Sequence, residues 1–299
     1  MSGAHPGSTG QTPTRARFVI MLLLFATVVL NYLDRANLSI AAPLLAKDLA
    51  IDPLKMGVVF SAFGWTYALC QIPGGWLVDR QHPRRFYAIA ILLWSIATLA
   101  MGFAWGLTAL FLLRLAVGAL EAPSFPINNR VVTTWFPERE RATAIGFYTS
   151  GQFVGLAFLT PVLAYLQTNY GWKTVFLVTG TIGIAWAAVW YTVYRDPKAF
   201  KGANEAEIEV IRNGGGLVDL SERSSAKQKS AFVMRDLGKV LSSRKLWGVY
   251  FGQRLIPLAP HPRGMVEHIT NNDHAEVPRC PIFRARCWNS SAGFPMTPP

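Results

Sequence analysis

ATAIGFYTSGQFVGLAFLTPVLAYLQTNYGW, residues 142–172, runs for 31 residues without a charged side chain. An apolar helix needs about 20 residues to cross the hydrocarbon core of a bilayer, so this stretch is long enough to span one. Three further uncharged runs are also long enough: 56–78, 86–113 and 174–194. The sequence therefore predicts several membrane-spanning helices.

The composition of the 299-residue chain argues against most soluble classes. Apolar residues make up 51% and charged residues 15%, whereas a soluble domain is about a quarter charged. This excludes a small soluble enzyme, a disordered chain and, with only 3 cysteines, a disulfide scaffold. The net charge of +12 does not indicate a nucleic-acid partner, because the basic residues lie in short connections between apolar runs.

Breaks in the apolar pattern separate six predicted helices. Gly102 and Gly106 interrupt the run 86–113, and the charged segment 138–141 follows Pro137. We expect an all-α integral membrane protein with a six-helix N-terminal bundle. Its spans are expected at 18–42, 56–78, 86–103, 107–131, 142–167 and 173–194.

Lysine and arginine are unevenly divided between the two sets of connections. The leader 1–17 and the connections after the second and fourth spans carry eight arginines, whereas the other three connections carry three lysines. Cytoplasmic connections of membrane proteins are rich in Lys and Arg. We therefore expect the N-terminus and the polar connector 195–245 to be cytoplasmic.

The end of the sequence differs from the rest. Residues 246–253 begin a seventh apolar run that is too short to cross a bilayer, and 254–299 hold 8 of the 19 prolines. We favour translation in a shifted reading frame over a genuine disordered cytoplasmic tail, because the segment keeps Phe283, Trp288 and Phe294. Its histidines and cysteines lack the close spacing of metal ligands, so no metal is expected.

Two charges lie inside the first predicted span, in NYLDRAN at 31–37. Asp34 is about 24 Å along a helix from the start of that span, where an ionised group is costly unless it faces a cavity or a partner. The alternative is a helix broken at Asn31, with Asp34 and Arg35 at the far interface. The 11 uncharged residues 36–46 argue against that alternative, so we interpret both charges as functional.

The fourth span carries Arg114 and Glu121, seven residues apart and therefore on one helix face. Pro123 and Pro126 follow, and each removes a backbone donor and loosens the helix. Glu121 is a candidate proton carrier, and a moving Arg114 could switch it. The alternative is a structural ion pair between helices.

Neutral polar side chains in two other spans could hydrogen-bond a polyhydroxylated ligand. Tyr67 and Gln71 lie one turn apart in the second span, and Gln152 lies in the fifth. Ordinary hydrogen bonds between helices explain these residues equally well. Three glycines of the fifth span are interpreted as close-packing positions: Gly146, Gly151 and Gly155.

The connection after the second span reads GWLVDRQHPRR over 75–85. A glycine followed four and five residues later by Asp-Arg, between two spans, is a specific pattern. Gly75 would allow a close helix contact, while Asp79 could cap a helix N-terminus and pair with an arginine, which would latch one conformation. The expected latch residues are Gly75, Asp79, Arg80 and Arg84.

These motifs resemble the major facilitator superfamily. The segment 75–85 is similar to its signature Gly-x-x-x-Asp-Arg-x-Gly-x-Arg, with His82 in place of the second glycine. Four motifs resemble the anion:cation symporters of the superfamily: NYLDRAN, QIPGGW at 71–76, EAPSFP at 121–126 with NNR at 128–130, and WFPE at 135–138. GFYTSGQFVG at 146–155 and GGGLVD at 214–219 are most similar to its bacterial sugar acid (D-galactonate):proton symporters.

The resemblance implies a role for each candidate residue. Arg35 would hold the substrate carboxylate, and Tyr67 and Gln152 would contact the sugar chain. The proton-coupling residues would be Asp34 and Glu121, with Arg114 paired to Glu121. The family has twelve spans in two six-helix halves with the substrate between them, and the resemblance covers only the first half, about 15–253. No cofactor is implied.

We therefore expect transmembrane transport, by proton-coupled symport of a sugar acid anion such as D-galactonate. The expected partners are a hexonate anion, protons and the lipid bilayer of the bacterial cell inner membrane. We expect this chain to be a truncated, inactive half. The alternatives are a six-span binding or assembly protein without transport, and a facilitator of another organic anion. No enzyme is expected, since no span carries paired metal ligands or a phosphate loop.

Overall fold

The computed structural model describes residues 12–219 of the chain. Within that range every regular element is a helix. The elements are α1 (Ala16–Asp48), α2 (Pro53–Arg80), α3 (Pro83–Met101), α4 (Leu107–Glu121), α5 (Ser124–Trp135), α6 (Glu138–Val154), η1 (Gly155–Leu159), α7 (Thr160–Tyr170), α8 (Trp172–Val193), η2 (Pro197–Ala199) and α9 (Glu205–Asn213). The expected seventh run at 246–253 and the tail 254–299 lie outside the described residues.

Turn residues account for several helix ends. The side chain of Asp52 accepts a hydrogen bond from the backbone N–H of Lys55 at 2.9 Å and so caps α2. Proline stands in the first turn of both α2 and α3, where its missing N–H costs nothing. Gly171 has a φ of +83°, which glycine adopts without a Cβ clash, and there the chain turns from α7 into α8.

Two of the expected spans are each built from more than one helix. The segment expected at 107–131 is divided into α4 and α5 on either side of Pro123. The segment expected at 142–167 contains the π-helical turn η1 between α6 and α7. Pro161 follows η1, and a proline cannot donate to the preceding turn and clashes with it. Both interruptions therefore coincide with a proline.

Among residues 12–219, five helical segments are long and apolar enough to cross a membrane: Ala16–Asp48, Pro83–Met101, Leu107–Trp135, Glu138–Tyr170 and Trp172–Val193. α2 has a comparable length but is not among them. Its apolar stretch includes Tyr67, Gln71 and four glycines, which lower its mean hydropathy. Our prediction of a membrane span at 56–78 rests on the absence of charged residues from that stretch.

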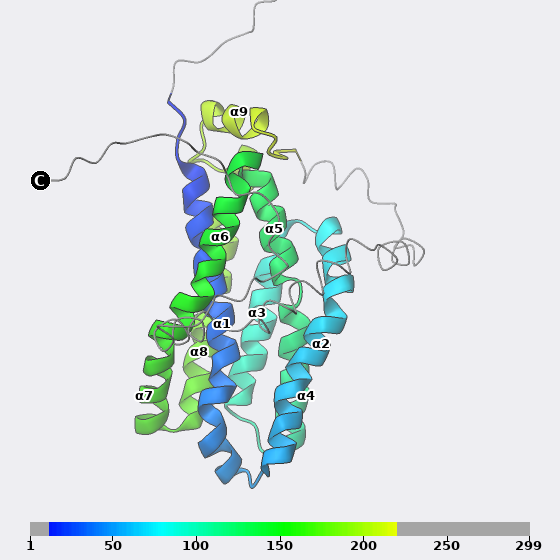
Figure 1. The fold of residues 1–299 in the computed structure, drawn as a ribbon, viewed down its shortest axis with the longest axis vertical. Coiled ribbons are helices and arrows are strands. Elements are labelled where there is room, and N and C mark those ends of the chain that lie inside the picture. Colours follow the sequence, from blue (N-terminus) through cyan, green and yellow to red (C-terminus); the bar gives the residue numbers. More distant parts are fainter. Residues whose placement is uncertain (1–11, 220–299) are drawn as a thin grey trace, which may run out of the picture. The chain divides into compact units, whose positions relative to one another are not determined.

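The long helices run side by side, and α9 lies across one end of the bundle (Figure 1). The core consists largely of two apolar clusters. One includes Leu24 and Val28 of α1 with several tryptophans, and the other begins at Leu38 of α1 and includes Trp172. The polar segment 31–37 lies between these two clusters along α1.

Contacts bring the basic connections to one end of the bundle. Arg17, at the start of α1, forms an ion pair with Glu140 at the start of α6. Arg84, at the start of α3, donates to the carbonyl of Tyr191 near the end of α8. The arginines that the sequence placed in alternate connections therefore lie at the same end of the fold.

Candidate functional site

Polar side chains gather near the middle of α1. The helix is continuous over 33 residues, so the alternative of a break at Asn31 is not seen. Asp34 lies roughly 27 Å from its first residue, close to the midpoint. Asn31, Asp34 and Asn37 are each at most 4% exposed. Asp34 therefore lies about as far along the helix as the sequence predicted.

Arg35 forms an ion pair with Glu121 of α4. Its Nε lies 3.3 Å from Oε2 of Glu121. The Glu121 side chain is fully buried, whereas 22% of the Arg35 side chain is exposed. Within residues 12–219, Nη2 of Arg35 and Oε1 of Glu121 have no hydrogen-bond partner. The pair thus retains one buried donor and one buried acceptor whose hydrogen bonds are unsatisfied.

Three aromatic rings surround the guanidinium of Arg35. Its Cζ lies 4.8 Å from the ring centre of Tyr32, 5.1 Å from that of Phe63 and 4.7 Å from that of Tyr67. Cation–π contacts of this kind hold a guanidinium without neutralising its charge. The structure therefore brings Arg35 and Tyr67 together as expected from the sequence. Phe63 was missed, although it is one helical turn from Tyr67 on the same face.

Arg114 does not form the ion pair with Glu121 that the family resemblance implied, because the ion pair of Glu121 is made with Arg35. The Cζ atom of Arg114 lies 4.9 Å from the ring centre of Phe63, and the residue is 4% exposed. In the described part of the chain, its Nε and Nη1 have no hydrogen-bond partner. The reason is that Glu121 pairs with Arg35 of α1. This contact joins two helices, so the spacing of residues within α4 could not predict it.

Asp34 faces a different neighbour from Arg35. Nδ2 of Asn37 donates to Oδ1 of Asp34 at 3.2 Å and to the Thr179 hydroxyl of α8 at 2.7 Å. Asp34 forms no ion pair within 4.0 Å with any residue in 12–219. The two adjacent charges of α1 therefore have different neighbours. Asp34 is bonded to Asn37 of its own helix, which also bonds Thr179 of α8, whereas Arg35 pairs with Glu121 of α4.

Gly118 lets α4 approach α2 at the site. A Cβ at this position would collide with the Thr66 hydroxyl and lie 2.5 Å from the carbonyl oxygen of Phe63. Gly118 lies between Arg114 and Glu121 on the same face of α4. The close crossing places Phe63 between the two arginines, so a glycine that sequence reasoning passed over determines the geometry of the site.

Gln152 is only half-buried, and its side chain makes no hydrogen bond within residues 12–219. Its neighbour Gly151 and Gly155 do pack closely, since a Cβ on either would lie about 3 Å from a backbone oxygen of α1. Gly146 has open space around it. The expected packing role is therefore confirmed for Gly151 and Gly155 and wrong for Gly146. In the same described range, no group of three or more His, Cys, Asp or Glu could hold a metal ion.

A profile of the Major Facilitator Superfamily matches residues 24–259. The chain belongs to this superfamily. It is 52% identical over 241 residues to the D-galactonate transporter of Escherichia coli O6:H1 (strain CFT073), covering 81% of this chain and 56% of that protein. It is also 42% identical over 249 residues to a Bacillus subtilis (strain 168) protein named "Probable galactarate/D-glucarate transporter", covering 81% of this chain and 54% of that protein.

A solved transporter structure has a similar fold over the matched region. It is a bacterial homologue of the human lysosomal transporter Spinster, in an inward-facing and unoccupied conformation. The match has a TM-score of 0.54 at 26% identity and covers 63% of this chain and 44% of that one. The chain spans about half the length of the curated relatives it matches.

The superfamily signature at 75–85 is arranged differently from our expectation. A Cβ on Gly75 would meet open space, whereas one on Gly74 would lie 3.3 Å from Pro123. The close contact is therefore made by Gly74, at the break between α4 and α5. Asp79 is exposed and caps no helix, because α3 starts after His82 without a side-chain cap.

Arginines around this signature contact backbone carbonyls and rings. Arg80 lies over the Trp76 ring at 3.9 Å, and Arg84 donates to the Tyr191 carbonyl at 3.0 Å. Arg130 of α5 donates to the carbonyls of Val78 and Gln81 at the end of α2. Arg130 was not proposed for the latch, although it ends the NNR motif. It is the arginine that joins α5 to this connection.

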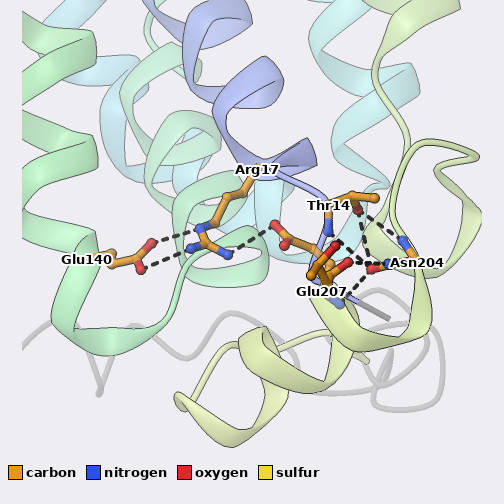
Figure 2. A network of polar contacts seen from close by, with 6 residues as sticks. Thr14, Arg17, Glu140, Asn204 and Glu207 are labelled. Atoms are coloured by element: carbon orange, nitrogen blue, oxygen red, sulfur yellow. Dashed lines mark hydrogen bonds and ion pairs between the residues drawn. The ribbon is translucent and has the colours of Figure 1, made fainter. Parts of the chain in front are cut away.

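The described first part of the connector, residues 195–219, is fastened to the same end of the bundle. Figure 2 shows Arg17 between Glu140 and Glu207, with ion-pair distances of 2.9 and 3.1 Å. Asn204 caps α9 and hydrogen-bonds Thr14. Ile208 and Ile211 of α9 are buried in the core. The apolar face of α9 therefore packs on the bundle.

Proposed function

We propose that this chain supplies the first half of a transporter that moves a sugar acid anion, such as D-galactonate, together with protons. The observation that carries the proposal is the Arg35–Glu121 ion pair, which lies between two apolar clusters and is framed by aromatic rings. The names of the relatives, which include D-galactonate and galactarate/D-glucarate transporters, support a sugar acid as the substrate.

Arg35 would bind the substrate carboxylate. A guanidinium meets a carboxylate through two parallel hydrogen bonds, and Nη2 of Arg35 is unpartnered in the described range. Tyr67, in contact with Arg35, and Gln152, which has its amide uncommitted, would contact the hydroxyl groups of the sugar chain. The aromatic frame would keep the guanidinium in place while its anionic partner changes.

Glu121 would couple the anion to a proton. A substrate carboxylate and Glu121 compete for the same guanidinium, so binding of the anion leaves Glu121 buried without a cation. A buried carboxylate without a partner is held more cheaply as the neutral acid. Anion binding and proton binding would therefore support each other. Asp34 would be the second proton-coupling carboxylate, and Arg114 would attract whichever carboxylate remains ionised.

Charge compensation is the physical reason for symport. An anion that enters a cell alone works against the membrane potential by about 2.3 kcal/mol per charge per 100 mV. Protons carried on Asp34 and Glu121 would offset this cost. We place the basic end of the bundle, with the N-terminus, on the cytoplasmic side of the bacterial inner membrane, because basic connections favour that side.

Uptake into proteoliposomes tests the proposal. Residues 1–253 of this chain would be joined to the second half of the E. coli D-galactonate transporter, and labelled D-galactonate uptake would be measured with and without a pH gradient. We expect gradient-driven uptake by the chimera and none by the chain alone. Uptake that does not depend on the pH gradient would instead favour a facilitator. If neither protein binds galactonate, the result would favour an assembly role.

A further inference from the structure

A second site lies outside the transport region, where α3 begins and α8 ends. A cavity of about 260 Å³ is lined there by His82, Arg84, Arg85, Arg195, Asp196 and Ala199. Three arginines face one carboxylate, so the lining has an excess of positive charge. Neither the ion pair at Arg35 nor the proposed coupling residues contribute to this cavity.

Two of the arginines are held in place by the end of α8. Nε of Arg84 and Nη1 of Arg195 both donate to the carbonyl oxygen of Tyr191, at 3.0 and 2.8 Å. Arg195 also donates to the Tyr194 carbonyl at 2.8 Å, and Arg84 stacks 4.4 Å from the Tyr191 ring centre. The last carbonyls of a helix have no intrahelical donor, so α8 fixes two like charges side by side. Their remaining N–H groups are suited to an oxyanion that bridges both.

Among the described residues, Asp196 is the acidic group of the lining, and it already has other partners. Asp196 accepts a hydrogen bond from the Tyr194 hydroxyl at 3.5 Å and lies within the electrostatic range of Arg130. One carboxylate cannot neutralise three arginines, so the lining keeps a net positive charge. A diester phosphate carries one negative charge and two free oxygens, which matches this arrangement of donors.

An apolar surface continues from the basic cavity along α3. Arg85, Ile89 and Leu93 follow one another at four-residue intervals and so form one stripe. Ile89 is 53% and Leu93 43% exposed. Both line a second cavity of about 260 Å³ with apolar walls from α2 and α4, including Leu77 and Leu120. The apolar walls of that groove cannot bind a hydrated ion, but they can hold a hydrocarbon chain.

The position of the two cavities fits a lipid. α3 and α8 are both long and apolar enough to cross a membrane, and the basic cavity lies where they end. Tyr191, 43% exposed beside it, is a residue type enriched at the level of lipid headgroups. We propose that this is a site for an anionic phospholipid, with the phosphate on Arg84, Arg85 and Arg195 and an acyl chain along Ile89 and Leu93.

Native mass spectrometry of the purified full chain tests the site. Dioleoyl phosphatidylglycerol, dioleoyl phosphatidylcholine and sn-glycerol 3-phosphate would be titrated separately. We expect the phosphatidylglycerol to bind most tightly, since it alone has both a net negative charge and acyl chains. Equal binding of the two lipids would overturn the role of the arginines. Equal binding of sn-glycerol 3-phosphate would overturn the lipid in favour of a free phosphate.

Variants locate the binding. R84Q/R195Q should weaken phosphatidylglycerol binding about 25-fold, because each arginine near a membrane surface contributes roughly 1 kcal/mol. R139Q removes an exposed arginine from a different hollow beside α9 and should change binding less than about two-fold, because distant charges are screened. Equal losses in both proteins would show a diffuse positive surface and overturn the site. C70W fills the apolar groove and should weaken the binding of phosphatidylglycerol but not of sn-glycerol 3-phosphate.

Discussion

Arg35 and Glu121 are 86 positions apart in the sequence, and their Nε and Oε2 atoms lie 3.3 Å apart in the fold. The arginine is partly exposed and the glutamate is fully buried. A ligand that enters the site therefore meets the guanidinium before the carboxylate. This order favours exchange of one anionic partner of Arg35 for another, which is the basis of the coupling proposed above.

Glu121→Gln should separate anion exchange from proton coupling. Glutamine keeps the size of the side chain but cannot take up a proton, and it no longer competes as an anion for Arg35. In the chimera we expect gradient-driven uptake to fall at least about ten-fold, while galactonate counterflow stays within about two-fold. Gradient-driven uptake that persists in the variant would show that Glu121 is not the carrier.

Arg35→Ala should abolish substrate binding, whereas Arg35→Lys should weaken it. Lysine retains the charge but loses the planar fork that meets a carboxylate in two hydrogen bonds. We expect the dissociation constant for galactonate, measured by isothermal titration calorimetry, to rise about ten-fold for lysine and more than about 100-fold for alanine. Equal effects of the two substitutions would mean that the fork geometry has no role.

Gly118→Ala should separate α2 from α4 and destabilise the bundle. The added Cβ would collide with the Thr66 hydroxyl and the Phe63 backbone, an overpacking that costs roughly 1–3 kcal/mol. Gly64→Ala is the matched control on α2, where a Cβ meets open space and alanine favours the helix. Thermal unfolding in detergent should show a lower Tm for the first variant and an unchanged or higher Tm for the second.

Arg17→Ala should release the connector helix α9. Glu207 is fully buried and takes its ion pair from Arg17, so the variant leaves an unpaired buried charge, at a cost of about 3 kcal/mol. Hydrogen exchange across residues 205–213 should speed up accordingly. Arg15→Ala removes an exposed arginine two residues away and should leave that exchange unchanged. Protection that survives the loss of Arg17 would assign the docking of α9 to its apolar contacts.

The start of α2 should loosen in acid. Hydrogen bonds from the Lys55 backbone and side chain lower the pKa of Asp52 below its usual value. A group whose pKa is lowered by folding contributes stability above its unfolded pKa and loses it as the pH falls through the folded value. Exchange of the Lys55 amide should therefore accelerate below about pH 4 relative to the intrinsic rate. Asp52→Asn, which caps without a charge, should remove this pH dependence.

Sequence reasoning identified Asp34, Arg35, Arg114 and Glu121 because a charge inside an apolar run stands out against its neighbours. It could not pair them correctly, since spacing along α4 describes only one helix. Phe63 and Gly118 carry no such signal, as an apolar residue and a glycine are ordinary in a membrane helix. Their importance comes from where α2 crosses α4.

The sequence alone determined the class of the protein, the helix-forming segments and which charged residues lie inside apolar runs, because hydrophobicity and charge are local properties of the chain. Only the tertiary structure decided that Glu121 takes Arg35 rather than Arg114, that Gly74 rather than Gly75 makes the close contact, and that α9 packs on the bundle. Those outcomes depend on which helices approach each other, and that is fixed by packing between residues far apart in the chain.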